Sequence, residues 1–450
     1  MIKRAMATVV TFAIVSTVAV CRGEGAAFAR TVAQRTHAVG VLTETFVDSS
    51  RSTVAWGPDS QEPTRTLVTT ILYPAAGSFS SAPPRPGAIP ARGEGPYPLV
   101  VFAHGLGSDP LQYEKLLGYW AASGFVVAAP QFPLTSDHTP GGPDAGDVVN
   151  QPGDMSFVIS SVLEESSRPG SALSGLVDPT EIGAAGHSNG AITTLGLVAN
   201  TCCVDRRVKA AVVMAGDEVP FAGGTYEMAK APPLLLVHGT ADELLPYALA
   251  IGMFNAAHGP KGLLTIEGGG HDSAAGLASD SSSSVFRTTT DFFAAYLRGD
   301  GAALRLISRD SKPRVTAVHF DPTLGSTATL PVPRAPVLHL HASATPTTNL
   351  SNGQTVTVRW SGYSAGEVVN ILECSPSVVQ SNSSAACSFS DAKILTPDPT
   401  GSGSVQLQMV EGTVGTGICD ASHPGCLIVV NNASSTDPDA SVRIPISFAP

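Results

Sequence analysis

The residues around Ser188 have the composition of a nucleophilic centre. Gly186-His187-Ser188-Asn189-Gly190 follows the apolar stretch 181–185 and precedes a helix-like stretch over 191–199. A G-x-S-x-G run between a strand and a helix is typical of a nucleophile elbow, a strained turn that lifts the serine hydroxyl out of the sheet. Its glycines allow the tight turn. Such a run is not specific in a chain with 45 glycines, so its weight depends on partners further along the chain.

A serine hydroxyl needs a base to activate it, and the base needs an acid to orient it. Asp242 stands just past the carboxyl end of the apolar run 233–237, and His271 closes a glycine-rich turn after the strand-like stretch 263–266. The intervals from Ser188 to Asp242 and from Asp242 to His271 each leave room for a helix and a returning strand. We therefore predict that Ser188 is the nucleophile, that His271 is the general base and then acid, and that Asp242 orients the imidazole.

Other residues compete for the acid and base roles. Asp217 follows the strand-like stretch 208–214 and is the main rival acid, whereas Asp242 could act only as the N-cap of a following helix. The rival histidines are His238, which belongs to a turn at a strand end, and His258, which lies in a polar turn. Both turns favour a structural role.

Acyl transfer also needs preformed N–H donors for the negative charge that develops on the carbonyl oxygen. The residue after the nucleophile supplies one, which here is the backbone N–H of Asn189. The apolar run 98–103 leads into the glycine-rich turn His104-Gly105-Leu106-Gly107. We assign the second donor of the oxyanion hole to the backbone of Leu106, and we expect His104 to be structural.

These residues resemble the α/β-hydrolase superfamily, and within it the branch of dienelactone hydrolases, platelet-activating-factor acetylhydrolases and cutinase-like polyester hydrolases. The stretches 65–75, 124–130 and 296–300 are similar to that branch's first hairpin, fourth strand and closing helix. The resemblance covers about residues 40–305. It implies an α/β fold with a doubly wound, mostly parallel sheet, catalysis through an acyl-enzyme, and no metal or organic cofactor.

The chain changes character beyond the predicted catalytic domain, residues 30–308. Residues 309–334 are rich in proline, threonine and charge, which is typical of a linker plus an entry strand. Residues 335–450 contain short alternating runs separated by turns, and we predict an immunoglobulin-like β-sandwich there. This segment resembles the neocarzinostatin-type apoproteins, for example over 350–356 and in its two short-range cysteine pairs. Its few aromatic residues do not favour an apolar ligand cleft, so we expect a stabilising or surface-docking appendage.

The first 29 residues have the pattern of a signal peptide. Lys3 and Arg4 precede the apolar stretch 5–20, and Ala27-Phe28-Ala29 fits a cleavage site. The apolar stretch is shorter than the roughly 20 residues that span a bilayer, so no stable membrane insertion is expected. We predict a secreted protein, with a cell-surface lipoprotein anchored through Cys21 as the alternative.

The remaining cysteines fit an exported chain. Local disulfides are expected within two pairs near the C-terminus, while an adjacent pair earlier in the chain allows either a vicinal bridge or buried thiols. The two C-terminal pairs are Cys374 with Cys387 and Cys419 with Cys426, and the adjacent pair is Cys202 and Cys203.

Composition limits the partners. The net charge of −11 disfavours nucleic acid and anionic membranes, and no cysteine and histidine spacing predicts a zinc site. The stretch 133–152 is the only candidate lid, and it is short, which favours an open site. We predict a serine hydrolase of small or polymeric carboxylic esters. A peptidase or amidase with the same triad, and a non-catalytic ligand-binding protein on this scaffold, are the alternatives.

Overall fold

A computed structural model describes residues 35–54, 61–140, 142–331, 340–363, 369–376, 378, 386–388, 392–395, 401–415, 417–432 and 441–450. The predicted signal peptide and Cys21 lie outside these described residues, as do residues 335–339 at the predicted start of the C-terminal domain.

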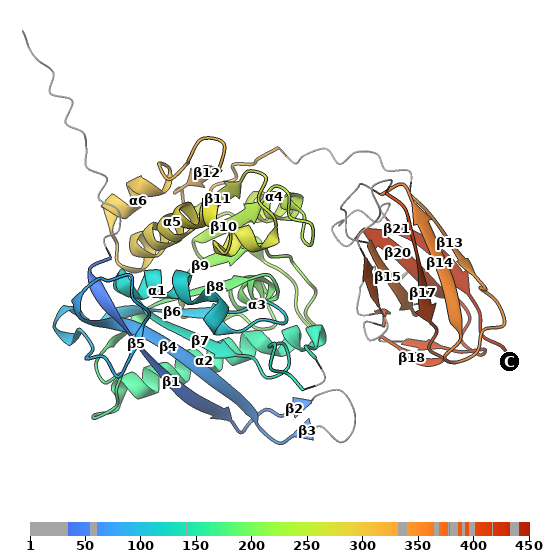
Figure 1. Cartoon of the computed structure of the whole chain (residues 1–450), viewed down its shortest axis with the longest axis horizontal. Coiled ribbons are helices and arrows are strands. Elements are labelled where there is room, and N and C mark those ends of the chain that lie inside the picture. The colour runs from blue at the N-terminus through green and yellow to red at the C-terminus, as the bar shows by residue number, and fades with distance from the viewer. Residues whose placement is uncertain are drawn as a thin grey trace, which may run out of the picture. The chain divides into compact units, whose positions relative to one another are not determined.

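A ten-stranded mixed sheet forms the framework of the first domain (Figure 1), with strand order β12-β11-β10-β9-β8-β6-β7-β4-β1-β5. The strands are β1 His37–Asp48, β4 Arg65–Ser78, β5 Arg85–Pro86, β6 Tyr97–Ala103, β7 Val126–Gln131, β8 Val177–His187, β9 Val208–Met214, β10 Leu234–Gly239, β11 Lys261–Ile266 and β12 Thr316–Asp321. Strands β6 to β11 run parallel to their neighbours in this group. Strands β4 and β12 join the group antiparallel, and β1 pairs antiparallel with β4. Two short strands, β2 Thr53–Val54 and β3 Gln61–Glu62, form a separate hairpin.

Helices cover both faces of this sheet, because its central strands are apolar on both sides. In β6, Leu99 and Val101 enter one core, while Val100 and Phe102 enter the other. The first core includes residues of α2 Gln151–Ser167, α3 Asn189–Ala199 and α4 Tyr247–Ala256, and the second includes residues of α1 Glu114–Ala122, α5 Ser279–Leu297 and α6 Gly301–Ile307. The short 3-10 helices are η1 Arg92–Glu94, η2 Pro110–Tyr113, η3 Ala145–Asn150, η4 Met228–Lys230 and η5 His271–Ala275. The α/β class predicted from the sequence is confirmed.

The end of the first domain differs from the sequence expectation. The stretch 309–334 was expected to be a linker plus an entry strand, and the strand found there, β12, pairs with β11 at the edge of the first domain's sheet. The buried Lys261 ammonium also donates a 2.7 Å hydrogen bond to the carbonyl of Ala328. A single edge strand between prolines has a composition close to that of a linker, which explains why the sequence pattern did not assign this strand to the first sheet. The sheet and its contacts continue at least to residue 328.

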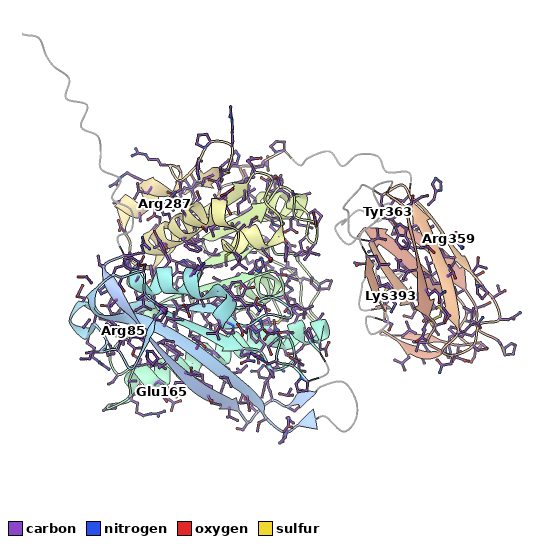
Figure 2. All side chains as sticks on the ribbon, in the orientation of Figure 1. Arg85, Glu165, Arg287, Arg359, Tyr363 and Lys393 are labelled. Atoms are coloured by element: carbon purple, nitrogen blue, oxygen red, sulfur yellow. A yellow bond between two sulfur atoms is a disulfide. The ribbon has the colours of Figure 1, made fainter. Side chains whose placement is uncertain are left out.

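The C-terminal part is all-β. One sheet contains β13 His341–Thr345, β14 Thr355–Ser361 and β17 Gly403–Gln408, and another contains β16 Lys393–Leu395, β15 Val369–Cys374, β20 Cys426–Asn432 and β21 Ser441–Ile446. A hairpin of β18 Gly412–Val414 and β19 Gly417–Cys419 accompanies them. Val356, Val358 and Trp360 are buried along β14, whereas Arg359 projects outward (Figure 2). Because of this alternation, the buried side chains of β14 join a core that also contains residues of the other sheet. The specifically immunoglobulin-like arrangement stays a prediction.

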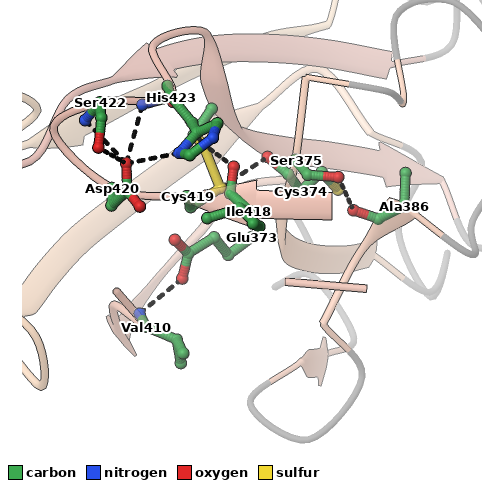
Figure 3. Close-up of a disulfide and its surroundings, with 11 residues drawn as sticks. Glu373, Cys374, Ser375, Ala386, Val410, Ile418, Cys419, Asp420, Ser422 and His423 are labelled. Atoms are coloured by element: carbon green, nitrogen blue, oxygen red, sulfur yellow. Dashed lines mark hydrogen bonds and ion pairs between the residues drawn. A yellow bond between two sulfur atoms is a disulfide. The ribbon is translucent and has the colours of Figure 1, made fainter. Parts of the chain in front are cut away.

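Three disulfides are present among the described residues. Cys374 bonds to Cys387 and Cys419 bonds to Cys426, as predicted, while Cys202 and Cys203 form a vicinal bridge, which the sequence left open. Figure 3 shows hydrogen bonds around a disulfide of the C-terminal part. There the Glu373 carboxylate accepts the backbone N–H of Val410, and Asp420 accepts hydrogen bonds from Ser422 and His423.

None of the helices in the described part of the chain combines the length and the apolar character needed to cross a bilayer.

Candidate active site

Ser188 occupies a sharp turn between β8 and α3. Its backbone has φ 56° and ψ −123°, a combination that is strained for any residue except glycine. A Cβ on Gly186 would lie 2.0 Å from the carbonyl oxygen of Gly190, and a Cβ on Gly190 would lie 2.1 Å from that of Ala103. Both flanking glycines are therefore required by close backbone contacts, as expected of an elbow that holds a serine at the carboxyl edge of the sheet.

Asp242 and His271 meet at the same edge, because β10 and β11 are parallel neighbours and each residue follows its strand. Nδ1 of His271 lies 2.8 Å from Oδ2 and 3.0 Å from Oδ1 of Asp242. The Asp242 side chain is fully buried, and that of His271 is 11% exposed. The imidazole is therefore fixed by a charged hydrogen bond shielded from water, which strengthens it.

The carboxylate of Asp242 accepts further hydrogen bonds. Its Oδ1 atom accepts the backbone N–H groups of Leu244 and Leu245, both at 2.9 Å. The turn-capping role that competed with catalysis in the sequence is thus real, and it occurs together with the contact to His271. Burial by itself would raise the pKa of Asp242, but hydrogen bonds from His238, His271 and the backbone outweigh it and hold the pKa well below its usual range. The group stays ionised at neutral pH.

His238 is the residue at this site that the sequence interpretation missed. Its Nε2 atom lies 2.7 Å from the carbonyl oxygen of Leu245 and 3.2 Å from Oδ2 of Asp242. A carbonyl oxygen only accepts, so Nε2 carries the hydrogen and points between two acceptors. The available signal was its position four residues before Asp242, at the end of the same strand. His238 thus supports the same carboxylate oxygen, Oδ2, that faces Nδ1 of His271.

The other rivals lie elsewhere. Asp217 accepts the N–H of Glu218 at 2.7 Å, and burial raises its pKa. His258 is exposed in the turn after α4. Among the described residues, neither makes a hydrogen bond or ion pair with His271, so the geometry favours Asp242 as the acid.

The second ring nitrogen of His271 is available for chemistry. Within the described part of the chain, its Nε2 atom is buried and has no hydrogen-bond partner. Ser188 is partly exposed, and its hydroxyl makes no hydrogen bond to another described residue. Hydrogen bonds between nucleophile and base are often loose in free enzymes and tighten with substrate. An unpaired buried acceptor is what a base needs to receive the serine proton.

The loop after β6 passes over the nucleophile. A Cβ on Gly105 would lie 3.4 Å from Cβ of Ser188. The N–H of Gly107 donates to Thr135, and that of Ser188 donates to Met214, so neither is free for a substrate oxygen.

The N–H groups of Leu106 and Asn189 make no hydrogen bond to other described residues. They belong to the two segments that approach Ser188, so this geometry fits the predicted oxyanion hole. His104, in contrast, holds the loop from below. Its Nδ1 donates to the carbonyl of Gly105 at 2.8 Å, its Nε2 accepts the N–H of Phe132 at 3.0 Å, and burial lowers its pKa to about 4.

Large apolar side chains are exposed on the loops at this edge of the sheet. They follow β6, β7, β10 and β11, the strands that also position the site. The five residues, called the apolar rim below, are Leu106, Leu111, Val149, Leu244 and Leu277. Exposed apolar residues gathered at a site favour a substrate with apolar groups.

The stretch 133–152, the candidate lid, is tied down by buried charges. The guanidinium of Arg65, which is 1% exposed, lies 2.5–3.0 Å from both carboxylate oxygens of Asp147 in η3 and 2.6–2.7 Å from those of Asp154 in α2. Opening this segment would leave buried charges unpaired, which is costly. The part of the segment in η3, which contains Asp147, is therefore held in place.

One group of residues could ligate a metal ion. Ligand atoms of Asp109, Asp137 and His138 lie within 4.8 Å of one another among the described residues. His138 is 65% exposed and already lies 3.4 Å from the Asp109 carboxylate. The acyl-transfer geometry does not involve this group.

A cavity of about 950 Å³ lies at the opposite edge of the sheet. Tyr97, Asp178 and Lys209, which line it, stand at or near the amino ends of their strands. Open α/β sheets bind ligands outside the carboxyl ends of their strands. The geometry around Ser188, and not cavity size, therefore locates the candidate active site.

Comparisons with known proteins find two family matches and a similar solved structure. Residues 65–253 match the chlorophyllase family, and residues 342–448 match the neocarzinostatin family. The first match contains Ser188 and Asp242 and ends before His271. A ferulic acid esterase from Streptomyces cinnamoneus is a similar solved structure, at 25% sequence identity and a TM-score of 0.48, with 63% of this chain and 96% of that chain covered. No curated protein matches the chain.

Proposed function

We propose that the protein is a serine hydrolase of carboxylic esters, a proposal supported by the match of residues 65–253 to the chlorophyllase family. In this proposal the Ser188 hydroxyl attacks the ester carbonyl while Nε2 of His271 takes its proton. The N–H groups of Leu106 and Asn189 bind the oxyanion. His271 then protonates the leaving alcohol, and an acyl-enzyme remains.

Water completes the cycle. Nε2 of His271 takes a proton from the water, the hydroxide attacks the acyl carbon, and the proton returns to Oγ of Ser188 as the acid leaves. Asp242 keeps the imidazole of His271 oriented. It also stabilises the positive charge that this imidazole carries in both steps.

One observation carries this proposal. His271 is held at Nδ1 by a buried carboxylate, while its other nitrogen, Nε2, is buried and unpaired at the edge where the strained Ser188 stands. A non-catalytic ligand-binding protein has no need for this combination, because strain and an unpaired buried acceptor both cost stability.

The apolar rim supports esters with apolar acyl or aryl groups. A peptidase or amidase would use the same triad, and no described feature favours it. We also propose export, with three disulfides in support. The proposed role of the neocarzinostatin-family domain is to stabilise the enzyme or to dock it on a surface, and the net charge of −11 argues against nucleic acid as a partner.

The test is hydrolysis by wild type and Ser188→Ala. We expect wild type to cleave p-nitrophenyl esters of some chain length, and Ser188→Ala to lose on the order of 10⁶-fold in kcat with an unchanged circular dichroism spectrum. A folded Ser188→Ala variant that retains wild-type hydrolysis would overturn the proposal. Faster cleavage of matched p-nitroanilides than of esters would assign the amidase alternative instead.

A further inference from the structure

A chain of hydrogen bonds runs beneath the nucleophile, through the residue that precedes it. The N–H of Gly105 donates to Oη of Tyr113 at 3.2 Å. Oη of Tyr113 lies 2.9 Å from Nδ1 of His187, and Nε2 of His187 lies 3.2 Å from the carbonyl oxygen of His271. The four residues come from the loop after β6, from η2, from β8 and from η5.

The direction of these bonds follows from the groups at each end. The His271 carbonyl can only accept, so Nε2 of His187 carries a hydrogen, and Nδ1 of the neutral ring must accept from the Tyr113 hydroxyl. That leaves the phenol oxygen to accept from Gly105. Every donor and acceptor is satisfied in this one arrangement, and hydrogen bonds in such a chain strengthen each other.

The surroundings keep His187 neutral. The ring is 3% exposed, and its centroid lies 4.9 Å from that of His271. Burial, followed by the proximity of His271, lowers the pKa of His187 to about 3. The charge of Asp242 raises the pKa of His187, whereas His238, like His271, lowers it. A neutral His187 retains its Nδ1 acceptor even when His271 becomes positively charged during the reaction.

The chain connects the two groups that act on opposite sides of Ser188. Gly105 immediately precedes Leu106, whose N–H is the proposed oxyanion donor, and the carbonyl of His271 belongs to the proposed base. We infer that Tyr113 and His187 are positioning residues, which hold the oxyanion loop and the base in register with the nucleophile. This inference rests on the proposed function.

Gly105 also shows how close this packing is. A Cβ there would lie 3.1 Å from Oη of Tyr113 and 3.4 Å from Cβ of Ser188. The ring of Tyr113 is fully packed, 4.8 Å from that of Phe102 between centroids. Replacing the tyrosine by phenylalanine therefore removes one oxygen and leaves the ring contacts in place.

The experiment compares Tyr113→Phe with Tyr97→Phe. Tyr97 is also buried, and its hydroxyl donates to a backbone carbonyl, that of Ala91, at the opposite edge of the sheet. Rates are expressed per active site titrated with a fluorophosphonate, so that unfolded protein does not count. Tyr113→Phe should lose about 10- to 100-fold in kcat, with KM changed by less than about twofold, because positioning acts mainly in the transition state. Tyr97→Phe should keep the wild-type kcat.

A double-mutant cycle with His187→Phe tests whether the two residues act as one chain. The double variant should be about as slow as the slower single variant, because breaking either bond disconnects the same chain. A Tyr113→Phe kcat per titrated site within about twofold of wild type, an equal loss in Tyr97→Phe, or fully additive effects would overturn the inference. Failure of the proposed function would appear differently, as a wild-type protein that neither hydrolyses esters nor reacts with the fluorophosphonate.

Discussion

Nε2 of His238 lies 3.2 Å from Oδ2 of Asp242, the oxygen that also lies 2.8 Å from Nδ1 of His271. One carboxylate oxygen therefore faces two imidazoles. The imidazole of His238 is held in place because its Nε2 hydrogen is also shared with the carbonyl oxygen of Leu245. This arrangement keeps the carboxylate ionised and fixed in place. It suggests separate tests for the acid and for its supporting histidine.

The acid should be Asp242 and not Asp217. Asp242→Asn presents an amide to His271 and favours the wrong tautomer, so kcat should fall by roughly 10⁴-fold. Asp217→Asn should change kcat by less than about tenfold, since Asp217 does not contact His271. Steady-state kinetics on one soluble ester would compare the two. A severe effect of Asp217→Asn together with a mild effect of Asp242→Asn would reverse the assignment.

Replacing His238 should change the pH dependence of the reaction. Its hydrogen bond helps to lower the pKa of Asp242, so His238→Phe should raise that pKa and begin to protonate the carboxylate at higher pH. The acid limb of the kcat/KM profile should therefore move to higher pH, and His258→Phe, at an exposed site, serves as the control. Superimposable profiles for His238→Phe and wild type would show that His238 does not act on the carboxylate.

Two buried histidines should make the fold sensitive to acid. Burial lowers the pKa of His187 to about 3 and that of His104 to about 4, whereas a histidine in the unfolded chain titrates near 6.5. Below about pH 6.5 the unfolded chain binds protons that the folded chain does not, so the free energy of unfolding falls as the pH drops. The slope approaches about 1.4 kcal/mol per pH unit for each histidine.

Urea unfolding between pH 7.5 and pH 4.5 would measure this loss, with the fluorescence of buried Trp120 as the probe in a background in which Trp56 and Trp360 are both replaced by phenylalanine. His138→Asn, at a 65% exposed position, should leave the pH dependence unchanged. Stability that stays constant over this range would contradict neutral, buried His187 and His104.

The position of β12 predicts where the chain can be shortened. A variant that ends at Pro331 keeps β12 and the contact between Lys261 and Ala328, so it should retain most activity on a soluble short-chain ester. A variant that ends at Arg309 exposes the edge of β11 and leaves a buried ammonium short of a partner, so it should aggregate or lose activity. Equal activity and stability of both truncated proteins would show that β12 is dispensable.

The sequence predicted the parts of the site that depend on local order along the chain. Ser188 could be found because an elbow requires glycines two residues away on each side, and Asp242 and His271 because each follows an apolar strand. Parallel strands end at one edge of a sheet, so residues distant in sequence were expected to meet there. These features follow from strand and turn patterns alone.

The sequence could not predict features that depend on side-chain packing. His187 directly precedes Ser188, and His238 stands four residues before Asp242. This spacing alone does not distinguish a histidine that supports the site from an ordinary core histidine. Tyr113 comes from a different segment, and only folding brings it to His187. The pairing of β12 with β11 was not predicted, because the prolines around this strand resemble those of a linker.

The most direct test is the site of fluorophosphonate labelling. The proposed mechanism predicts a single covalent adduct, found by intact mass and located on Ser188 by peptide mapping, with hydrolysis lost in proportion to labelling. Ser188→Ala should acquire no adduct. The absence of any adduct on an active wild-type enzyme, or inhibition with the adduct on a different residue and Ser188 unmodified, would contradict the assignment of Ser188 as the nucleophile.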